Sequence, residues 1–284
     1  MKIQTTSHLL NGSPLSSGDA MPKIPIALTI AGSDPTSGAG IQADLKTFEA
    51  HGVYGLSVIT ALTAQNTNGV QSVYPIPVGE IQKQCESLIE DIPFKVIKTG
   101  MIYDAEAAEY IAAFIATHDL LAIVDTPFIS SSGMKLAQDD AVEIFFKKLI
   151  PNSMLVTPNI FEAERLSGVQ IWSRSDMEQA AAKILCAGAN AVFIKGGHLR
   201  GIWSPDLFLS PGEKVWFDSE RVDANPHGTG CALSAAITAN LALGYTLVES
   251  VKNSKEYITE AIRNSISIGH GRNVLSHSSL IMQV

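Results

Sequence analysis

The sequence predicts an α/β protein in three layers, with a central, mostly parallel sheet flanked by helices on both sides. Short apolar runs rich in Val, Ile and Leu alternate with amphipathic or alanine-rich stretches of helical length along most of the chain. Strands that alternate with helices in this way form parallel sheets covered on both faces. With 284 residues, of which 46% are hydrophobic, the chain is long enough for a large core.

We expect a single domain over residues 23–284, because no repeat or linker interrupts the alternation. Residues 1–22 are rich in Ser, Gly and Pro, and their apolar patch is too short for the core of a signal peptide. They are expected to form a disordered N-terminal extension.

The first third of the domain contains three expected strands. An apolar run over 26–31 ends at a glycine-rich loop, 32–40, which leads into a helix over 41–50. A β-branched run over 55–64 ends at the amide-rich turn 65–69, and residues 70–76 form the next strand. Pro77 is a favoured first residue of a helix, and apolar residues at helical spacing follow it to about residue 92.

The alternation continues through the rest of the chain. Expected strands cover 94–98, 120–124, 154–157 and 191–195, and expected helices cover 105–117, 141–149, the stretch after Asn159, 176–187, 229–243 and 246–268. Two short alternating segments around Pro211 and Gly212 predict a β-hairpin at an edge of the sheet.

Charge and cysteine content exclude several classes of function. The net charge of −8 and the pI near 5.3 argue against nucleic acid or an anionic membrane as the main partner, because both favour a basic surface. No apolar run reaches the roughly 18 residues of a membrane helix. Cys85, Cys186 and Cys231 form neither a CxxC pair nor a cluster with histidines, which indicates a reducing, cytoplasmic location.

The segment from His227 to Cys231 (HGTGC) runs directly into a helix of small residues. Two glycines at the start of a helix let backbone N–H groups converge where the helix dipole is positive, which makes an anion-binding site. The same field favours a thiolate at Cys231. On this segment alone, a tight turn followed by a small buried cysteine explains the pattern equally well.

Polar residues follow the ends of several expected strands, where open α/β sheets bind their ligands. These residues are Asp34, Gln65, Met101, Asp125, Asn159, Glu162 and Lys195. Asn159 and Glu162, three residues apart, fit a helix capping box and also a water-ligated Mg²⁺ site; by themselves they favour the capping box. Lys195 is either a solvated surface charge or a contact to a phosphate. His198 is interpreted as a loop residue rather than a metal ligand. The loop 32–40 matches neither the phosphate-binding pattern GxxxxGK[ST] nor the dinucleotide-binding pattern GxGxxG. A mobile connection between strand and helix therefore explains it as well as a ligand-binding loop does.

Together, an anion-binding turn, an Asn/Glu pair, a lysine and a candidate base are the parts that phosphoryl transfer uses. Five segments then carry a family resemblance in collinear order over about residues 26–269. They are ALTIAGSDPTSGAGIQADLKTFEAHGVYGLSVITALTAQNTNGVQSVYPI, KTGM, TPNIFEAERL, IKGGH and HGTGCALSAAITA. These segments closely resemble the hydroxymethylpyrimidine/phosphomethylpyrimidine kinases of thiamin biosynthesis, a branch of the ribokinase-like superfamily.

The resemblance implies a ribokinase-like fold and two successive reactions with Mg-ATP. Members phosphorylate 4-amino-5-hydroxymethyl-2-methylpyrimidine and then its monophosphate. The resemblance places the pyrimidine against Gly32, Ala39 and Met101, with hydrogen bonds from Asp44 and Gln65. An amide and a carboxylate suit an aminopyrimidine edge, which offers both donors and acceptors.

The resemblance also assigns the phosphate end of the site. It places ATP against Lys195, Asp125, Asn159 and Thr229, and Mg²⁺ near Asn159 and Glu162, held through water. The N–H groups of Gly228, Thr229 and Gly230 would stabilise the transferring phosphoryl group. Cys231 stands where most ribokinase-like enzymes carry an aspartate base, and acts either as a base or by positioning the substrate hydroxyl. The family further implies a homodimer.

The chain departs from the family pattern at two places. Phe128 replaces a smaller side chain and Ser131 replaces a lysine near the active site, and the tail over Gly269–Val274 lacks the usual Gly-x-Gly-x-x-Pro. Phe128 and Ser131 affect the expected shape and charge of the site wall near the phosphates. With the changed tail, they make the second phosphorylation a weaker expectation than the first. Two alternatives remain open: a pyridoxal kinase, whose aldehyde substrate suits the thiol of Cys231, and a non-catalytic binding protein on the same fold. The missing GxGxxG disfavours an oxidoreductase.

Overall fold

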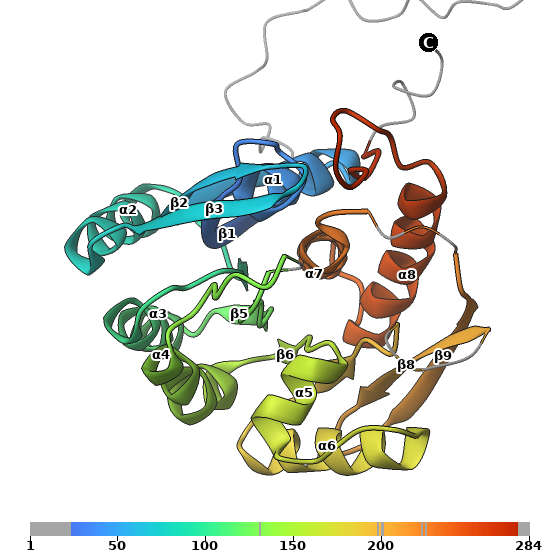
Figure 1. The fold of residues 1–284 in the computed structure, drawn as a ribbon. Helices are drawn as coiled ribbons and strands as arrows, with labels where there is room; N and C mark the ends of the chain where they lie inside the picture. Colours follow the sequence, from blue (N-terminus) through green and yellow to red (C-terminus); the bar gives the residue numbers. More distant parts are fainter. Residues whose placement is uncertain are drawn as a thin grey trace, which may run out of the picture.

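One nine-stranded sheet organises the computed structural model, which describes residues 24–277 except 131, 198, 200, 201, 223 and 225 (Figure 1). The strand order is β3-β2-β1-β4-β5-β6-β7-β8-β9. The strands are β1 (Ile26–Ser33), β2 (Tyr54–Asn66), β3 (Gly69–Pro75), β4 (Val96–Thr99), β5 (Leu121–Val124), β6 (Leu155–Val156), β7 (Val192–Ile194), β8 (Trp203–Leu209) and β9 (Lys214–Glu220). The expectation of disorder over 1–22 lies outside the described residues.

The six central strands, β2 to β7 in the sheet order, pair in parallel. Antiparallel pairing is confined to the two edges, where β3 pairs with β2 and the hairpin of β8 and β9 pairs with β7. The expected hairpin at a sheet edge is therefore confirmed. So is the mostly parallel sheet, whose inner strands β4 and β5 are almost entirely buried because both faces are covered.

Helices cover both faces of the sheet (Figure 1). On one face lie α1 (Gly40–Ala50), α7 (Thr229–Ala242) and α8 (Leu247–Arg263), whose apolar side chains form two clusters with the strands. On the other face lie α2 (Val78–Asp91), α3 (Ala105–Thr117), α4 (Asp139–Ile144), α5 (Ile160–Ser167) and α6 (Arg174–Cys186), which share the largest core cluster. The three-layer α/β architecture is thus confirmed. No helix in the described ranges is long and apolar enough to cross a bilayer.

Two helix predictions were wrong in extent. The helix expected over 141–149 is regular only as far as Ile144 and continues as a π-helical turn over Phe145–Leu149. The helix expected to run to 268 ends at Arg263. The residues after it, Ser265 to Gly269, are serines, isoleucines and a glycine, all weaker helix formers than alanine. The chain instead turns back, so that Ile266 bridges to Val274.

That returning tail positions the site. The backbone of His227 pairs with the tail, since its N–H donates to the carbonyl oxygen of Asn273 at 2.8 Å. The start of α7 is therefore held between the glycine-rich loop after β1 and the C-terminal tail.

Candidate active site

A large cavity of about 1100 Å³ lies beyond the carboxyl ends of the central strands. Its lining comes from the loops that follow β1, β4, β5, β6 and β7, from the hairpin β8–β9, and from the N-terminal end of α7. This is where open α/β sheets bind ligands. At about 1100 Å³ it exceeds a typical single-ligand pocket, so it has room for two substrates side by side.

The glycine-rich loop 32–40 is held in place by Asp34. The carboxylate accepts hydrogen bonds from the backbone N–H groups of Thr36 and Ala39, both at 2.8 Å, and lies 3.1 Å from Nε2 of His227. Burial disfavours the ionised form of Asp34, but the hydrogen bonds from His227 and Thr36 outweigh it and lower the pKa. The loop is therefore a fixed wall of the cavity.

Close backbone approach explains the glycines at the start of α7. Gly228 is the N-cap and has a positive φ of 84°. A Cβ at Gly228 would lie 1.7 Å from the carbonyl oxygen of Gly38, and one at Gly40 would lie 2.4 Å from that of Gly32. Only glycine fits such contacts. The two loops therefore meet backbone to backbone, and the first N–H groups of α7 are left at the cavity.

Cys231 lines the cavity in the first turn of α7. Burial raises the pKa of its thiol to about 11, and the carboxylates of Asp44 and Asp125 add to this, although Lys98 and the N–H of Gly40 favour the thiolate. The expectation that the helix terminus would favour a thiolate is therefore corrected: burial near two carboxylates outweighs it. At neutral pH Cys231 is a thiol.

Asp44 is also corrected, because it does not line the cavity. Its side chain is fully buried, with Oδ2 2.7 Å from Nζ of Lys98 and 2.7 Å from Oγ1 of Thr29. Its Oδ1 is buried and accepts no hydrogen bond within the described residues. Asp44 is thus the counter-ion of a buried lysine and is not among the described residues that line the cavity.

Sequence reasoning missed Lys98. Its side chain is fully buried and yet lines the floor of the cavity. Burial disfavours the ammonium, but attraction to the carboxylates of Asp44 and Asp125 outweighs it and raises the pKa of Lys98. The signal was available: a lysine inside the apolar run of β4 is almost never fully buried unless it is paired.

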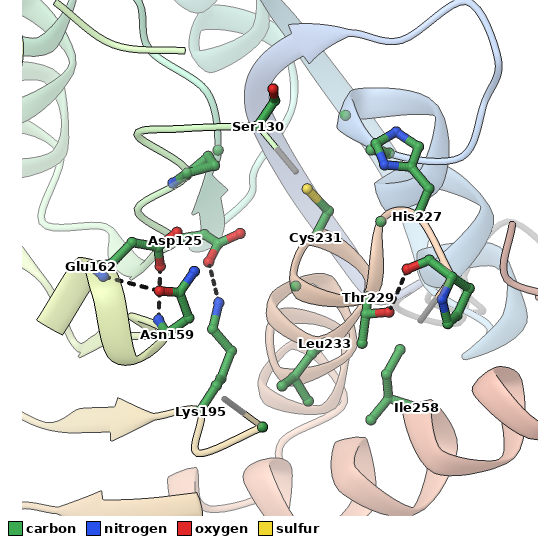
Figure 2. A pocket seen from close by; sticks show the side chains of 18 of the residues that line it. Asp125, Ser130, Asn159, Glu162, Lys195, His227, Thr229, Cys231, Leu233 and Ile258 are labelled. Atoms are coloured by element: carbon green, nitrogen blue, oxygen red, sulfur yellow. Dashed lines mark hydrogen bonds and ion pairs between the residues drawn. The ribbon is translucent and has the colours of Figure 1, made fainter. Parts of the chain in front are cut away.

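Lys195 also lines the cavity, and Figure 2 shows its side chain pointing to Asp125. Its Nζ is 3.0 Å from Oδ1 of Asp125, which also accepts a hydrogen bond from Thr157. Burial disfavours the ammonium of Lys195, but Asp125 and Glu162 raise its pKa. A Cβ at Gly230 would lie 3.3 Å from this Nζ, so the lysine sits beside the first turn of α7.

Asn159 and Glu162 form a capping box at the start of α5, as that interpretation of the sequence predicted. Oδ1 of Asn159 accepts from the N–H of Glu162, and Oε2 of Glu162 accepts from the N–H of Asn159 at 2.8 Å. Both residues also line the cavity beside Lys195. Burial, with Asp125 nearby, raises the pKa of Glu162 to about 7, although Lys195 favours its ionised form.

The donor set fits a hydrated cation better than a directly bound one. Within the described part of the chain, no group of three or more His, Cys, Asp or Glu side chains is placed to hold a metal ion. Glu162 offers one carboxylate oxygen, Oε1, beyond the capping box. Mg²⁺ keeps most of its waters and takes few protein ligands, so the pair fits a water-mediated Mg²⁺.

The other expected pyrimidine contacts, Gly32, Ala39, Gln65 and Met101, line the opposite end of the cavity. Nε2 of Gln65 lies 2.8 Å from Nε2 of His227, and the hairpin turn of β2 and β3 follows it. A Cβ at Gly32 would lie 3.0 Å from Sδ of Met101. The structure thus brings all of these residues except Asp44 to one surface.

A third part of the cavity is more apolar and is formed by α7 and α8. Figure 2 shows Leu233 and Ile258 facing this space below Thr229, whose hydroxyl donates to the carbonyl oxygen of Pro226. Phe128, a departure from the family pattern, is 2% exposed and packs against Phe145, so most of its bulk is in the core. Ser131 and His198 lie outside the described residues.

Comparisons with known proteins agree with this geometry. A family model described as phosphomethylpyrimidine kinase matches residues 34–276. The hydroxymethylpyrimidine/phosphomethylpyrimidine kinase of Streptomyces coelicolor is 41% identical over 254 residues, which cover 89% of this chain and 94% of the relative.

Solved structures give the same result. The phosphomethylpyrimidine kinase of Clostridium difficile is 44% identical, with a TM-score of 0.75 over 84% of this chain and 99% of that one. A Bacillus subtilis pyridoxal kinase in complex with ADP is 35% identical, with a TM-score of 0.83 over 92% of this chain and 100% of that one. The ribokinase-like fold is confirmed, and the chain belongs to the phosphomethylpyrimidine kinase family.

Proposed function

We propose that this kinase transfers the γ-phosphoryl group of ATP to the hydroxymethyl group of 4-amino-5-hydroxymethyl-2-methylpyrimidine, and then phosphorylates the monophosphate. One observation carries the proposal: the N-terminal turn of α7, Lys195, Gln65 and Met101 all line a single cavity. The relatives' names and the family match support the same pair of substrates.

The pyrimidine end selects the acceptor. The side chain of Gln65, oriented by His227, offers an amide to the ring edge, while Met101 and Gly32 form a flat apolar wall. An amide both donates and accepts, as an aminopyrimidine requires. The resemblance implied hydrogen bonds to the pyrimidine from both Asp44 and Gln65. Because Asp44 does not line the cavity, we assign these hydrogen bonds to Gln65.

The phosphate end stabilises charge. Lys195, Gly228, Thr229, Gly230 and Cys231 all line the cavity, and the lysine with the N–H groups of the three residues before Cys231 would stabilise the transferring phosphoryl group. Phosphoryl transfer has a loose transition state and depends mostly on positioning and electrostatics. A protonated Cys231 suits this chemistry, because it positions the hydroxyl while the reaction needs little base catalysis.

Asn159 and Glu162 would hold Mg²⁺ through water beside Lys195 and Asp125. The ion would neutralise charge on the ATP phosphates. Leu233 and Ile258 line the apolar part of the cavity, which suits the nucleobase.

Pyridoxal is the second candidate acceptor. The structural likeness to a pyridoxal kinase covers more of this chain than that to the Clostridium enzyme, and a thiol at Cys231 can add to an aldehyde. Parallel assays with both acceptors separate the two functions.

We further propose a cytoplasmic homodimer. The three cysteines are unpaired, which suits a reducing compartment. Leu62 and Tyr74 form a cross-strand pair on β2 and β3, and are 45% and 64% exposed, so this edge of the sheet offers an apolar surface to a second copy. Sedimentation of the wild type and of Tyr74→Glu tests the dimer, which the charged variant should weaken.

Lys195→Met tests the proposed role of this lysine. Loss of a preorganised charge at a phosphoryl group costs about a hundredfold to a thousandfold in kcat. Lys183→Met is the matched control, because Lys183 is exposed on α6, away from the cavity lining, and its Nζ donates to the carbonyl oxygen of Ser167. A soluble, folded Lys195→Met with wild-type kcat would contradict the assignment.

A further inference from the structure

Among the residues that the structure describes, six lysine and arginine side chains line the cavity, and five of them are already neutralised or hydrogen-bonded. Lys98 pairs with Asp44, Arg165 with Asp139, Lys195 with Asp125 and Lys255 with Asp206, while Arg221 donates to the carbonyl oxygens of Gly197 and Leu199. The sixth is Arg272. Its side chain makes no ion pair or hydrogen bond with any residue that the structure describes.

Arg272 sits on a segment that is held firmly. Its N–H donates to the carbonyl oxygen of Thr67 at 2.9 Å, and the N–H of Gly271 donates to Oγ1 of the same threonine at 3.0 Å. A Cβ at Gly271 would lie 2.1 Å from the carbonyl oxygen of Thr67, so the tail and the β2–β3 turn are in backbone contact. The backbone that carries the arginine is therefore held in place before a ligand binds.

The surroundings of Arg272 suit an anion. It also lines a small side pocket, of about 50 Å³, which adjoins the pyrimidine end of the main cavity and shares Gln65, His227 and Ser130 with it. The described residues around this side pocket supply hydroxyls, amides and backbone groups, and none is an aspartate or glutamate. Asp34, a carboxylate of the main cavity that contacts His227 of the side pocket, already bonds to that histidine and to the loop.

We propose that Arg272 binds the phosphate of the phosphomonoester acceptor and thereby determines how well the kinase uses the monophosphate relative to the unphosphorylated pyrimidine; this rests on the proposed function. The unphosphorylated pyrimidine is uncharged, so it offers no counter-charge to the unpaired, partly buried guanidinium at the acceptor end of this acidic protein. A phosphate matches its planar set of donors.

The second phosphorylation explains why such a cation is needed there. An oxygen of the acceptor phosphate forms a bond to the γ-phosphorus of ATP, the bond from that phosphorus to the β–γ bridging oxygen breaks, and ADP leaves with the electron pair. Two anions must approach each other for this step. Arg272 would hold the oxygens that do not attack and reduce the repulsion.

The test compares kcat/KM for the two pyrimidines in Arg272→Gln, Arg272→Lys and a control. We expect Arg272→Gln to lower kcat/KM for the monophosphate about tenfold or more beyond any fall for the unphosphorylated pyrimidine. Arg272→Lys should restore part of the loss. The control is Arg263→Gln, which removes the same charge from an exposed site on α8. An equal fall with both substrates, or an unchanged ratio, overturns the proposal.

Calorimetry of the monophosphate without ATP separates this inference from the proposed function. We expect its Kd to rise about tenfold in Arg272→Gln, but not in Arg263→Gln. If the wild type phosphorylates neither pyrimidine, the proposed function fails and the binding comparison still judges Arg272. Equal Kd values, or no binding to the wild type, overturn the role of Arg272.

Discussion

Replacing Lys98 by methionine should destabilise the fold by about 3–5 kcal/mol, because the change leaves a carboxylate buried without its counter-ion. Nζ of Lys98 lies 2.7 Å from Oδ2 of Asp44, and both side chains are fully buried. Thr29 would be the one remaining donor to the carboxylate. A loss of this size is a large part of the roughly 5–15 kcal/mol that stabilises a typical domain.

Asp44→Asn should cost a similar amount, because it strands the ammonium of Lys98 while keeping an acceptor for Thr29. The double variant removes both charges and should lose only about 1–3 kcal/mol, the cost of an amide with unmet hydrogen bonds. The free energy of unfolding of the four proteins, from urea titrations followed by circular dichroism, gives the coupling between the two residues.

Additive losses in the double variant would refute the buried-pair interpretation. The same proteins also test the correction made for Asp44. If Asp44 and Lys98 only balance each other's charge, the double variant should keep the wild-type KM for the pyrimidine. A KM raised about tenfold or more in the double variant, despite restored stability, would show that the pair contributes to substrate binding, through Lys98, which lines the cavity, or through Asp44.

Two further predictions concern the start of α7. Gly228→Ala should fail to fold normally, because its Cβ would lie 1.7 Å from the carbonyl oxygen of Gly38 at a φ of 84°. Gly230→Ala should fold and lose activity, because among the described residues its Cβ meets the end of the Lys195 side chain, at 3.3 Å, and no backbone atom. Thermal unfolding separates the two variants, and equal melting temperatures would contradict the contact at Gly228. Because burial raises the pKa of Cys231 to about 11, its alkylation by iodoacetamide, read for each cysteine by mass spectrometry, should accelerate about tenfold per pH unit from pH 7 to 9. A rate that levels off near pH 7 would show a thiolate, and a loss of kcat far above tenfold in Cys231→Ala would show that the reaction needs a base.

The strands and most helices were predictable because the inner strands are mostly apolar and several helices begin at clear caps. Ser173 and Thr246, for example, start α6 and α8 with capping boxes that can be seen in the sequence. The end of α8 was not predictable, because it depends on a bridge between Ile266 and Val274 that forms only in the folded chain.

The site was predictable at the level of strand ends, since parallel strands bring Asp125, Asn159 and Lys195 to one edge of the sheet. Burial was not. The roles of Asp44 and Cys231 depend on how deeply each lies beside Lys98, and this depth is set by the packing of α1, α7 and β4 in three dimensions. The carboxylate therefore became a counter-ion and the thiol stayed protonated.

The most direct test of the central claim is ADP release from Mg-ATP with purified protein, measured in parallel with the hydroxymethylpyrimidine, its monophosphate, pyridoxal and no acceptor. The geometry of the cavity predicts release that depends on both pyrimidines, with the monophosphate responding most to Arg272. Release with pyridoxal alone, or no stimulation by any acceptor, would contradict the account.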